Sequence, residues 1–322
     1  MSALICGSIA YDNIMVFQGR FKEHILPDQI HILNVSFLVP ELRREFGGCA
    51  GNVAYNLRLL GGDPRIMATV GSDFAPYRAW LTRHGVNLAQ VLEVPEMLTA
   101  QAYITTDLDD NQITAFHPGA MNEAHRITVS AGVVGEGAAR ADAGITVAIV
   151  SPDGRQGMVD HAAQLYDAGI PFIFDPGQGL PMFDGLDLRH FVDQATWVAV
   201  NDYEARLLTD RTGWSEDEVA GKVRALIVTH GALGSTIWAD GERIEIPAVK
   251  PRAILDPTGC GDAYRAGLLY GITRSLPWAD TGRLASLIGA IKIAHKGTQN
   301  HHFTPAFLAK EFQSAFGHEL RL

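Results

Sequence analysis

Cysteine is scarce in this sequence of 322 residues, which has only three, at positions 6, 49 and 260. Three scattered cysteines are too few for a disulfide framework or a cysteine-based zinc site. No apolar run reaches the roughly 18 residues that a transmembrane helix needs. The first residues, MSALICGSIAYD, contain neither a basic leader nor a small-residue cleavage site. Together these absences predict a protein of the reduced cytoplasm.

Positive charge is also in the minority, with 26 basic against 36 acidic side chains and a net charge of −10. A protein that coats nucleic acid or an anionic membrane has the opposite balance, so we expect neither as a partner. Short basic clusters such as Arg43-Arg44 are interpreted as solvated helix faces. The sequence contains no internal repeat, low-complexity tract or linker, and we therefore expect a single domain over residues 1–322.

Two common nucleotide-binding motifs are missing as well. The sequence has no Walker A pattern ending in Gly-Lys-Ser/Thr, and no G-x-G-x-x-G follows a predicted strand. A P-loop NTPase and a Rossmann dehydrogenase are both disfavoured.

The strongest positive pattern is a series of short apolar runs that each end at a polar residue. Ser151, Asp175, Asn201 and Thr229 follow the runs at 145–150, 171–174, 196–200 and 225–228. Helical stretches lie between or after these runs: 155–168, 185–194, 202–208 and a segment opened by the capping box Ser215…Glu218. This alternation predicts an α/β fold with a doubly wound, mostly parallel sheet and helices on both faces.

Ligands of such sheets bind beyond the carboxyl ends of the strands. We expect the polar residues that end the runs to lie along that edge, with Asp12 delivered there by the first strand, LICGSIA. Any one of them could merely cap a strand.

Two regions depart from the strand–helix alternation. Residues 13–40 alternate weakly, and residues 99–117 are typical of a hairpin. We predict a small β-sheet lid inserted at about 13–40 and 98–120. Because lid strands have free edges, a lid-mediated homodimer is a secondary hypothesis.

The stretch DPTGCGDAYRAG, residues 256–267, places glycines at the start of a predicted helix. Gly259, Cys260 and Gly261 would present backbone N–H groups to a phosphate as an anion hole. Asp262 on the first turn would repel that phosphate, unless its task is to take a proton from an attacking hydroxyl. Equally, it could simply stabilise the helix dipole.

Four stretches in order resemble the ribokinase-like (PfkB) carbohydrate kinase family: GGCAGNVAYNLRLLGG (47–62), NDYE (201–204), THGALG (229–234) and DPTGCGDAYRAG. The resemblance implies a ribokinase-like fold and transfer of a phosphoryl group from Mg-ATP to a primary hydroxyl. It also implies that Asp262 acts as the general base.

Within that family the sequence is most similar to the adenosine kinases of bacterial ribokinase type. Stretches such as GSIAYDNI, FHPGAM and TGWSE carry this likeness. It implies a nucleoside as the acceptor, most simply adenosine, and substrate contacts at Ser8, Asp12, Ser36, Gly48, Asn52, Phe116 and Gln178. Purely structural roles remain as alternatives for these positions, since Asp12 could cap a strand and Phe116 could belong to the lid core.

The resemblance also implies residues for ATP and cations. Asn201 and Glu204 would organise Mg²⁺ through water, and Thr229, Gly231 and Gly234 would line the nucleotide. Asp256 and Thr258 match positions that help to hold a monovalent cation such as K⁺. His301-His302, without a paired ligand, is interpreted as polar surface.

Three residues depart from the family pattern: Cys260 replaces a smaller residue, Gly179 a second glutamine and Ala102 a lid aromatic. The last two loosen the expected specificity for the base. Alternatives to a nucleoside kinase are a sugar kinase acting on ribose or fructose and, from another class, a nucleoside-binding sensor without turnover.

Overall fold

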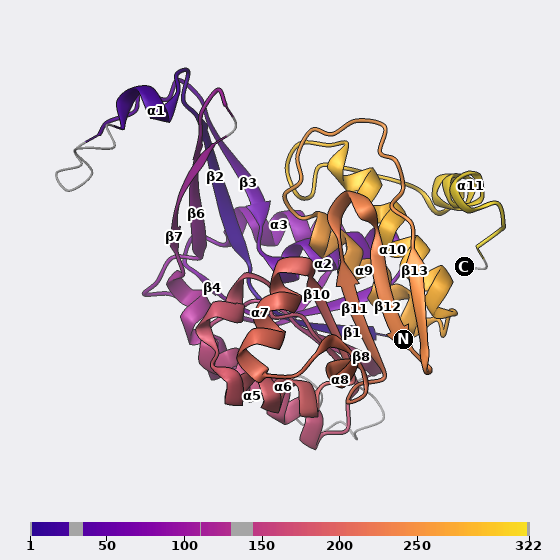
Figure 1. Cartoon of the computed structure of the whole chain (residues 1–322). Coiled ribbons are helices and arrows are strands. Elements are labelled where there is room, and N and C mark those ends of the chain that lie inside the picture. Colours follow the sequence, from indigo (N-terminus) through magenta and orange to yellow (C-terminus); the bar gives the residue numbers. More distant parts are fainter. Residues whose placement is uncertain (1, 26–34, 110, 130–143, 321–322) are drawn as a thin grey trace.

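The computed structural model describes residues 2–25, 35–109, 111–129 and 144–320. They form a nine-stranded sheet with helices on both faces and a separate four-stranded sheet that projects from it (Figure 1). Part of the predicted alternation at 13–40, residues 26–34, lies outside the described residues.

The large sheet has the strand order β13-β12-β11-β10-β9-β8-β1-β4-β5. Its strands are β1 Ser2–Cys6, β4 Asp63–Gly71, β5 Asn87–Val94, β8 Ile145–Val150, β9 Phe172–Phe174, β10 Trp197–Asn201, β11 Ala225–Thr229, β12 Ser235–Ala239 and β13 Glu242–Ile246. Neighbours pair in parallel except at the β11–β12 and β12–β13 hairpins. The four predicted apolar runs correspond to β8, β9, β10 and β11, which confirms the mostly parallel sheet.

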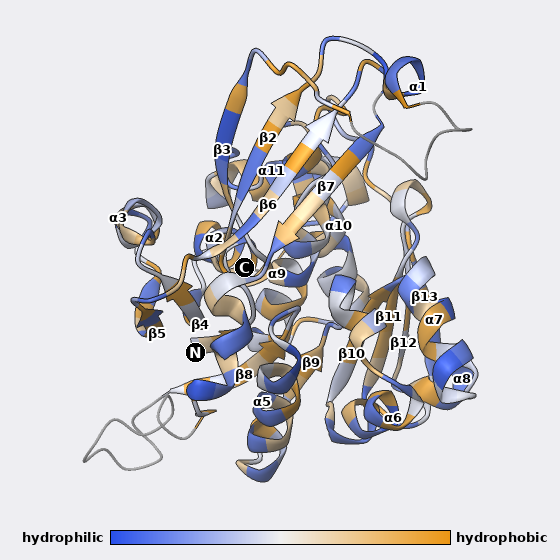
Figure 2. Cartoon of the chain, turned by 90° about the vertical axis from the view of Figure 1, so that its left-hand side faces the viewer, coloured by the Kyte–Doolittle hydropathy of each residue, from blue (hydrophilic) through white to orange (hydrophobic). Residues whose placement is uncertain are grey.

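Successive side chains of the central strand β1 enter different cores. Ala3 and Ile5 belong to the cluster packed against α2, α9, α10 and α11, whereas Leu4 and Cys6 belong to the cluster packed against α5, α6 and α7. Because both faces of the central strands are covered, these strands are mainly apolar, as Figure 2 shows for β8 and β9. The fold class predicted from the alternation is confirmed.

The helices agree with the capping signals. They are α1 Phe21–His24, α2 Cys49–Leu59, α3 Ala75–Arg83, α5 Arg155–Asp167, α6 Gly185–Gln194, α7 Asp202–Thr212, α8 Glu216–Ala220, α9 Cys260–Thr273, α10 Trp278–Ile293 and α11 Pro305–Phe316, with the 3₁₀ segments η2 Gly119–Arg126, η3 Gly177–Met182 and η4 Gly231–Leu233. Ser215 caps α8 in a capping box with Glu218, as predicted. Among the described residues, no helix is both long and apolar enough to cross a membrane.

The small sheet has the order β3-β2-β6-β7, formed by β2 Ala10–Val16, β3 Leu42–Gly47, β6 Ala100–Thr106 and β7 Gln112–His117. The hairpin predicted at 99–117 is β6–β7, but the first lid segment extends beyond the predicted 13–40 at both ends. Arg43 and Arg44 are therefore on a strand, and their interpretation as a helix face was wrong. Arg44 Nε donates to Asn13 Oδ1 at 3.0 Å, and its guanidinium covers the ring of Tyr11, contacts that hold β3 to β2.

Candidate active site

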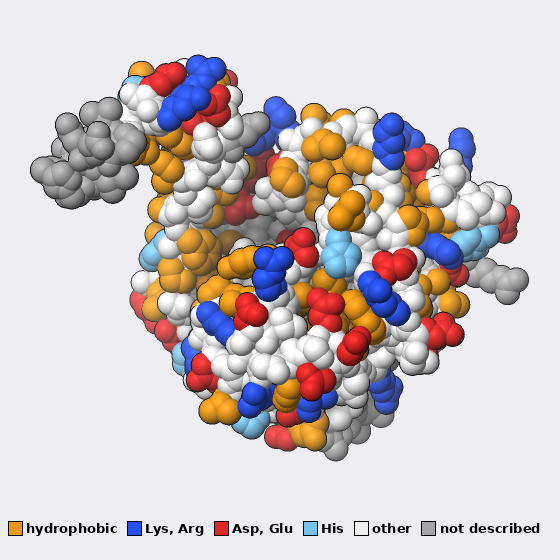
Figure 3. Space-filling model, viewed as in Figure 1, with side chains coloured by type: hydrophobic (Ala, Val, Ile, Leu, Met, Phe, Trp, Pro, Cys, Tyr) orange, Lys and Arg blue, Asp and Glu red, His pale blue; other side chains and the backbone are white. Residues whose placement is uncertain are grey.

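One cavity of about 880 Å³ lies between the small sheet and the carboxyl ends of the parallel strands. The space-filling view shows the surface hollowed between these two parts (Figure 3). Most of the site residues predicted from the sequence line this cavity: Ser8, Asp12, Gly48, Asn52, Phe116, Gln178, Asn201, Glu204, Thr229, Gly231, Thr258, Gly259, Gly261 and Asp262. Residues from seven separate chain segments thus meet in one place.

The start of α9 has the geometry of an anion site. Gly259 is its N-cap in the left-handed conformation, with φ of 78°. In the described part of the chain, the N–H groups of Gly259 and Gly261 have no acceptor, whereas the Cys260 N–H donates to Pro257 O at 3.1 Å. A Cβ at Gly261 would meet no atom of the described residues within 4 Å. Gly259 and Gly261, rather than Cys260, offer free donors to a phosphate.

Asp262 lies on the first turn of α9, as predicted. Its Oδ2 accepts a hydrogen bond of 2.8 Å from Asn52 Nδ2, which is on the first turns of α2. Burial raises the pKa of Asp262 to about 6, although the bond from Asn52 opposes the shift. A carboxyl with that pKa is ionised at neutral pH and is matched to accepting a proton.

Asp12 faces the same cavity from a different element than expected. The first strand ends at Cys6, and Asp12 lies on β2 of the small sheet, so the prediction that the first strand delivers it was wrong. Burial raises the pKa of Asp12 to about 7, and repulsion from Asp262 adds to the shift. Beside it, Gly48 has φ of 83° and caps α2; a Cβ there would lie 2.6 Å from Ser8 O. The glycine allows the backbones of α2 and the β1–β2 turn to touch.

Asn201 and Glu204 form a second capping box, at the start of α7. Glu204 Oε2 accepts from the Asn201 N–H, and Oε1 accepts from Asn201 Nδ2, both at 2.8 Å. Burial raises the pKa of Glu204, with Asp175 adding to the shift and Arg265 opposing it. Since both carboxylate oxygens are already hydrogen-bonded, the pair is suited to a hydrated ion rather than to direct coordination. Among the described residues, no three His, Cys, Asp or Glu side chains converge on a metal site.

Four predicted residues do not line the cavity: Ser36, Gly234, Asp256 and Cys260. Ser36 is exposed. Gly234 has φ of 100° at the turn between β11 and β12, a backbone role that requires glycine.

Burial raises the pKa of the Cys260 thiol to about 11. All three cysteines are free thiols.

Asp256 is partly buried in the loop that precedes α9. Its Oδ1 accepts from the Thr258 N–H at 2.9 Å, and its Oδ2 accepts from the Gly297 N–H at 2.8 Å. Burial disfavours its charge, but these two bonds outweigh burial and hold the pKa of Asp256 below its ordinary value.

Several lining residues carry chemistry that the sequence analysis did not assign. Arg265 is buried and donates from Nε and Nη2 to Asp175 Oδ1, at 3.2 and 3.1 Å, with Glu204 Oε2 3.9 Å away. Asp153 is buried, and its Oδ2 has no hydrogen-bond partner among the described residues. Burial raises the pKa of Asp153 to about 8. Two signals in the sequence were available: an arginine inside the apolar helix pattern at 263–272, and an aspartate three residues after the end of β8.

His301 is fully buried, so its interpretation as polar surface was wrong, while His302 is exposed. His301 Nε2 lies 2.7 Å from Asn56 Oδ1, and the Tyr55 hydroxyl donates to His301 O. Burial lowers the pKa of His301 to about 3, which keeps the ring neutral. The histidine anchors the C-terminal segment against α2, a contact between residues far apart in the sequence.

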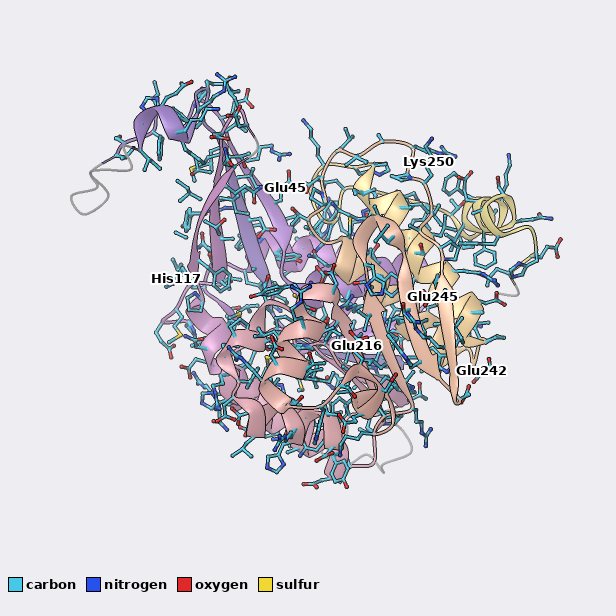
Figure 4. The ribbon with its side chains drawn as sticks, viewed as in Figure 1. Glu45, His117, Glu216, Glu242, Glu245 and Lys250 are labelled. Atoms are coloured by element: carbon cyan, nitrogen blue, oxygen red, sulfur yellow. The ribbon has the colours of Figure 1, made fainter. Side chains whose placement is uncertain are left out.

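The same segment also touches the small sheet. Glu45 on β3 lies where that sheet approaches the rest of the molecule (Figure 4), and its Oε2 accepts from Asn300 Nδ2 at 2.9 Å. The base of the lid is thereby joined to the loop that follows α10.

Comparison with known families agrees with this geometry. Residues 10–305 match the pfkB family carbohydrate kinases. The chain belongs to this family. It is accordingly a phosphotransferase with an alcohol group as acceptor, and the resemblance in the sequence motifs is confirmed.

Individual relatives are similar over nearly the whole chain. A Burkholderia thailandensis nucleoside kinase in complex with inosine is 55% identical, with a TM-score of 0.87 over 98% of this chain and 99% of that one. The complex of that kinase with ADP-inosine is 56% identical, with a TM-score of 0.85 over 99% of each chain. A nucleoside kinase of Methanothermobacter thermautotrophicus is 30% identical over 96% of this chain and 97% of its own.

Proposed function

We propose that this pfkB-family chain is an ATP-dependent nucleoside kinase that transfers the γ-phosphoryl group to the ribose 5′-hydroxyl, with adenosine among its acceptors. The observation that carries the proposal is that one cavity joins a proton acceptor, a helix N-terminus with free N–H groups and an apolar pocket under the small sheet. The inosine and ADP-inosine complexes of the similar Burkholderia kinase support a nucleoside and a nucleotide as its two ligands.

The acceptor would lie between the small sheet and α2. Asp12 and Asn52 offer a carboxylate and an amide to ribose hydroxyls, while the far end of the cavity is mostly apolar. Lining residues there are Ile104, Phe116, Met121, Pro152 and Met182, with Gln178 as a polar contact. A free sugar has hydroxyls on every side and would leave this apolar end unused, so the lining favours a flat nucleobase.

Asp262 would accept the proton of the 5′-hydroxyl as that oxygen attacks the γ-phosphorus. The Asn52 amide stabilises the ionised carboxylate, so Asp262 is ready as a base. The free N–H groups of Gly259 and Gly261, at the positive end of the α9 dipole, would stabilise the charge of the transferring phosphoryl group. Closure of the small sheet over the acceptor would exclude water, and with it ATP hydrolysis.

ATP would extend from α9 toward Thr229 and Gly231. Asn201 and Glu204 would hold Mg²⁺ through water, and the ion would neutralise phosphate charge beside the acidic cavity. Arg265 already compensates the charges of Asp175 and Glu204 on that side, which lowers the repulsion that a triphosphate meets.

The apolar end of the cavity, where the nucleobase would lie, offers few contacts that distinguish one nucleobase from another. Gly179 and Ala102 line it without polar or aromatic side chains, and Phe116 is half-exposed. We therefore propose that purine nucleosides other than adenosine, inosine among them, are also phosphorylated.

Initial rates with Mg-ATP on adenosine, inosine, guanosine, cytidine, uridine, ribose and fructose test the proposal. We expect the highest kcat/KM on a purine nucleoside and a loss of about 10³-fold or more in kcat for Asp262→Asn. Turnover on a sugar but on no nucleoside would establish the sugar-kinase alternative. Binding of nucleosides by calorimetry without any turnover would establish the sensor.

A further inference from the structure

The side chain of Lys292 is fully buried beside Asp256, under the loop that opens α9. Lys292 lies on the last turn of α10, and its Nζ donates to Asp256 O at 2.7 Å and lies 3.9 Å from Asp256 Oδ1. A lysine ammonium is almost never fully buried without a partner, because its desolvation is costly. Its position against two oxygens of one aspartate therefore indicates a specific electrostatic role.

The surroundings of Asp256 do not fit the monovalent cation that the resemblance implies at Asp256 and Thr258. Each oxygen of Asp256 already has a donor: Oδ1 has the Thr258 N–H, Oδ2 has the Gly297 N–H, and the backbone O has Lys292 Nζ. A potassium ion at this aspartate would have to displace these donors and would lie within a few Å of a second positive charge. Two like charges at such a distance repel strongly in a buried site.

The ammonium also reaches the part of the chain that matters for phosphate binding. The N–H groups of Leu255 and Asp256 donate to Ile293 O at 2.9 and 3.2 Å, so the loop is joined to the end of α10 by its backbone as well as by Lys292. Three residues after Asp256, the chain reaches Gly259, the N-cap of α9. A positive charge fixed here supports both the shape of the loop and the potential at the start of that helix.

We infer that the ammonium of Lys292 takes the place of a bound monovalent cation, and that phosphoryl transfer by this protein does not require potassium. This inference rests on the proposed kinase activity only for its rate measurements. It identifies Lys292 as a positioning residue that acts through Asp256 and the 256–259 loop.

The cation dependence of the wild type is the first test. The rate on the best acceptor is measured in KCl and in tetramethylammonium chloride at equal ionic strength, together with the thermal midpoint of the ligand-free protein. We expect the rate to change by less than about twofold and the midpoint to be the same in both salts. A rate increase of about tenfold or more in KCl would overturn the inference.

Two variants test Lys292 itself. Lys292→Ala removes the ammonium and leaves a space beside Asp256, whereas Lys292→Met removes the charge but fills the space. In tetramethylammonium chloride we expect both to lose about tenfold or more in kcat, and K⁺ or NH₄⁺ to restore Lys292→Ala but not Lys292→Met. The exposed Lys296 provides the control Lys296→Ala, for which we expect the wild-type rate in both salts.

A Lys292→Ala variant that is fully active in tetramethylammonium chloride would refute the role of the ammonium. Loss of activity in both variants without rescue by any cation, with a wild-type thermal midpoint, would refute the equivalence between lysine and cation. The thermal midpoints need no turnover: potassium should raise that of Lys292→Ala and leave the wild type unchanged. They test the inference even if the proposed substrate is wrong.

Discussion

The amide of Asn52 and the carboxylate of Asp262 lie 2.8 Å apart, Nδ2 to Oδ2, although 210 residues separate them in the chain. The orientation of that amide is determined by a third residue, because Gln299 Nε2 donates to Asn52 Oδ1 at 3.0 Å. Gln299 is in turn held by Trp80, whose Nε1 donates to Gln299 Oε1 at 2.9 Å. The proton acceptor proposed for the reaction is thus aligned from the C-terminal segment.

The first prediction concerns this chain of hydrogen bonds, Trp80–Gln299–Asn52–Asp262, which we call the relay. In Gln299→Leu the Asn52 amide loses its fixed orientation, so the Asp262 carboxylate is less stabilised and its pKa rises above about 6. The acid limb of the kcat/KM profile should move to higher pH, with a loss of about tenfold in kcat/KM at neutral pH. Trp80→Phe, which removes only the outer bond, should show a smaller shift. An unmoved acid limb in Gln299→Leu would argue against the relay.

The buried carboxyls make stability depend on pH. Burial raises the pKa values of Asp12, Asp153 and Asp262, so the folded state binds more protons than the unfolded state between about pH 4 and pH 8. Their contribution to stability is present at low pH and is lost as the pH rises through this range. In this pH range, each group lowers the free energy of unfolding by up to about 1.4 kcal/mol per pH unit.

Asp153→Asn should therefore flatten the pH dependence of the free energy of unfolding, because its amide does not ionise. Urea unfolding at about pH 5 and about pH 8.5, on wild type and variant without ligands, measures this. The surface variant Asp160→Asn is the control. Parallel curves for Asp153→Asn and wild type would show that Asp153 does not titrate in this range.

Arg265 should prove essential to the stability of the cavity. Arg265→Met leaves Asp175 and Glu204 without their buried partner, and removal of one member of a buried ion pair costs about 3–5 kcal/mol. Denaturant unfolding at neutral pH measures the loss, which should become smaller at lower pH because the raised pKa of Glu204 lets that carboxyl take up a proton. Arg265→Lys keeps the charge and should be less destabilised. An Arg265→Met variant as stable as the wild type would contradict a stabilising role for the buried ion pair.

Gly179 offers a test of specificity. In Gly179→Gln a Cβ would lie near two flexible side chains, 3.1 Å from Met182 Cε and 3.4 Å from Met158 Sδ, so the substitution can be accommodated. The added amide should hydrogen-bond one purine edge better than others and change the ratio of kcat/KM for adenosine and inosine by about tenfold. Gly179→Ala, which adds no polar group, should leave the ratio unchanged. If both variants keep the wild-type ratio, the base does not lie at Gly179.

From the edges and exposed apolar side chains of the small sheet, we predict that the protein forms a dimer. Among the described residues no strand pairs with the outer edges of β3 and β7, and Leu42, Tyr103 and Ile113 expose apolar side chains on this sheet. Such edges commonly pair between subunits. Sedimentation at micromolar concentration should give a dimer, which Ile113→Lys should weaken without lowering the thermal midpoint. A wild-type monomer at that concentration would exclude the dimer.

Local chemistry allowed much of this protein to be predicted from its sequence. The alternation of apolar runs and helices determined the parallel sheet, and the glycines before Asp262 determined a helix N-terminus with free N–H groups. The motif Asn201-x-x-Glu204 and the strand-end residues Asp175 and Thr229 all lie at the predicted edge, because parallel strands end together there.

The rest depended on contacts between distant segments, which no local pattern encodes. Asp12 lies on the small sheet because β1 ends early, at Cys6, and Arg43 and Arg44 lie on β3 because pairing with β2 overrides their polarity. The burial of His301 and Lys292 and the alignment of Asn52 by Gln299 follow from how the C-terminal segment packs against α2 and α9. Sequence determined which chemical groups line the candidate active site, whereas tertiary packing decided which of them touch, and touching neighbours shift their pKa values.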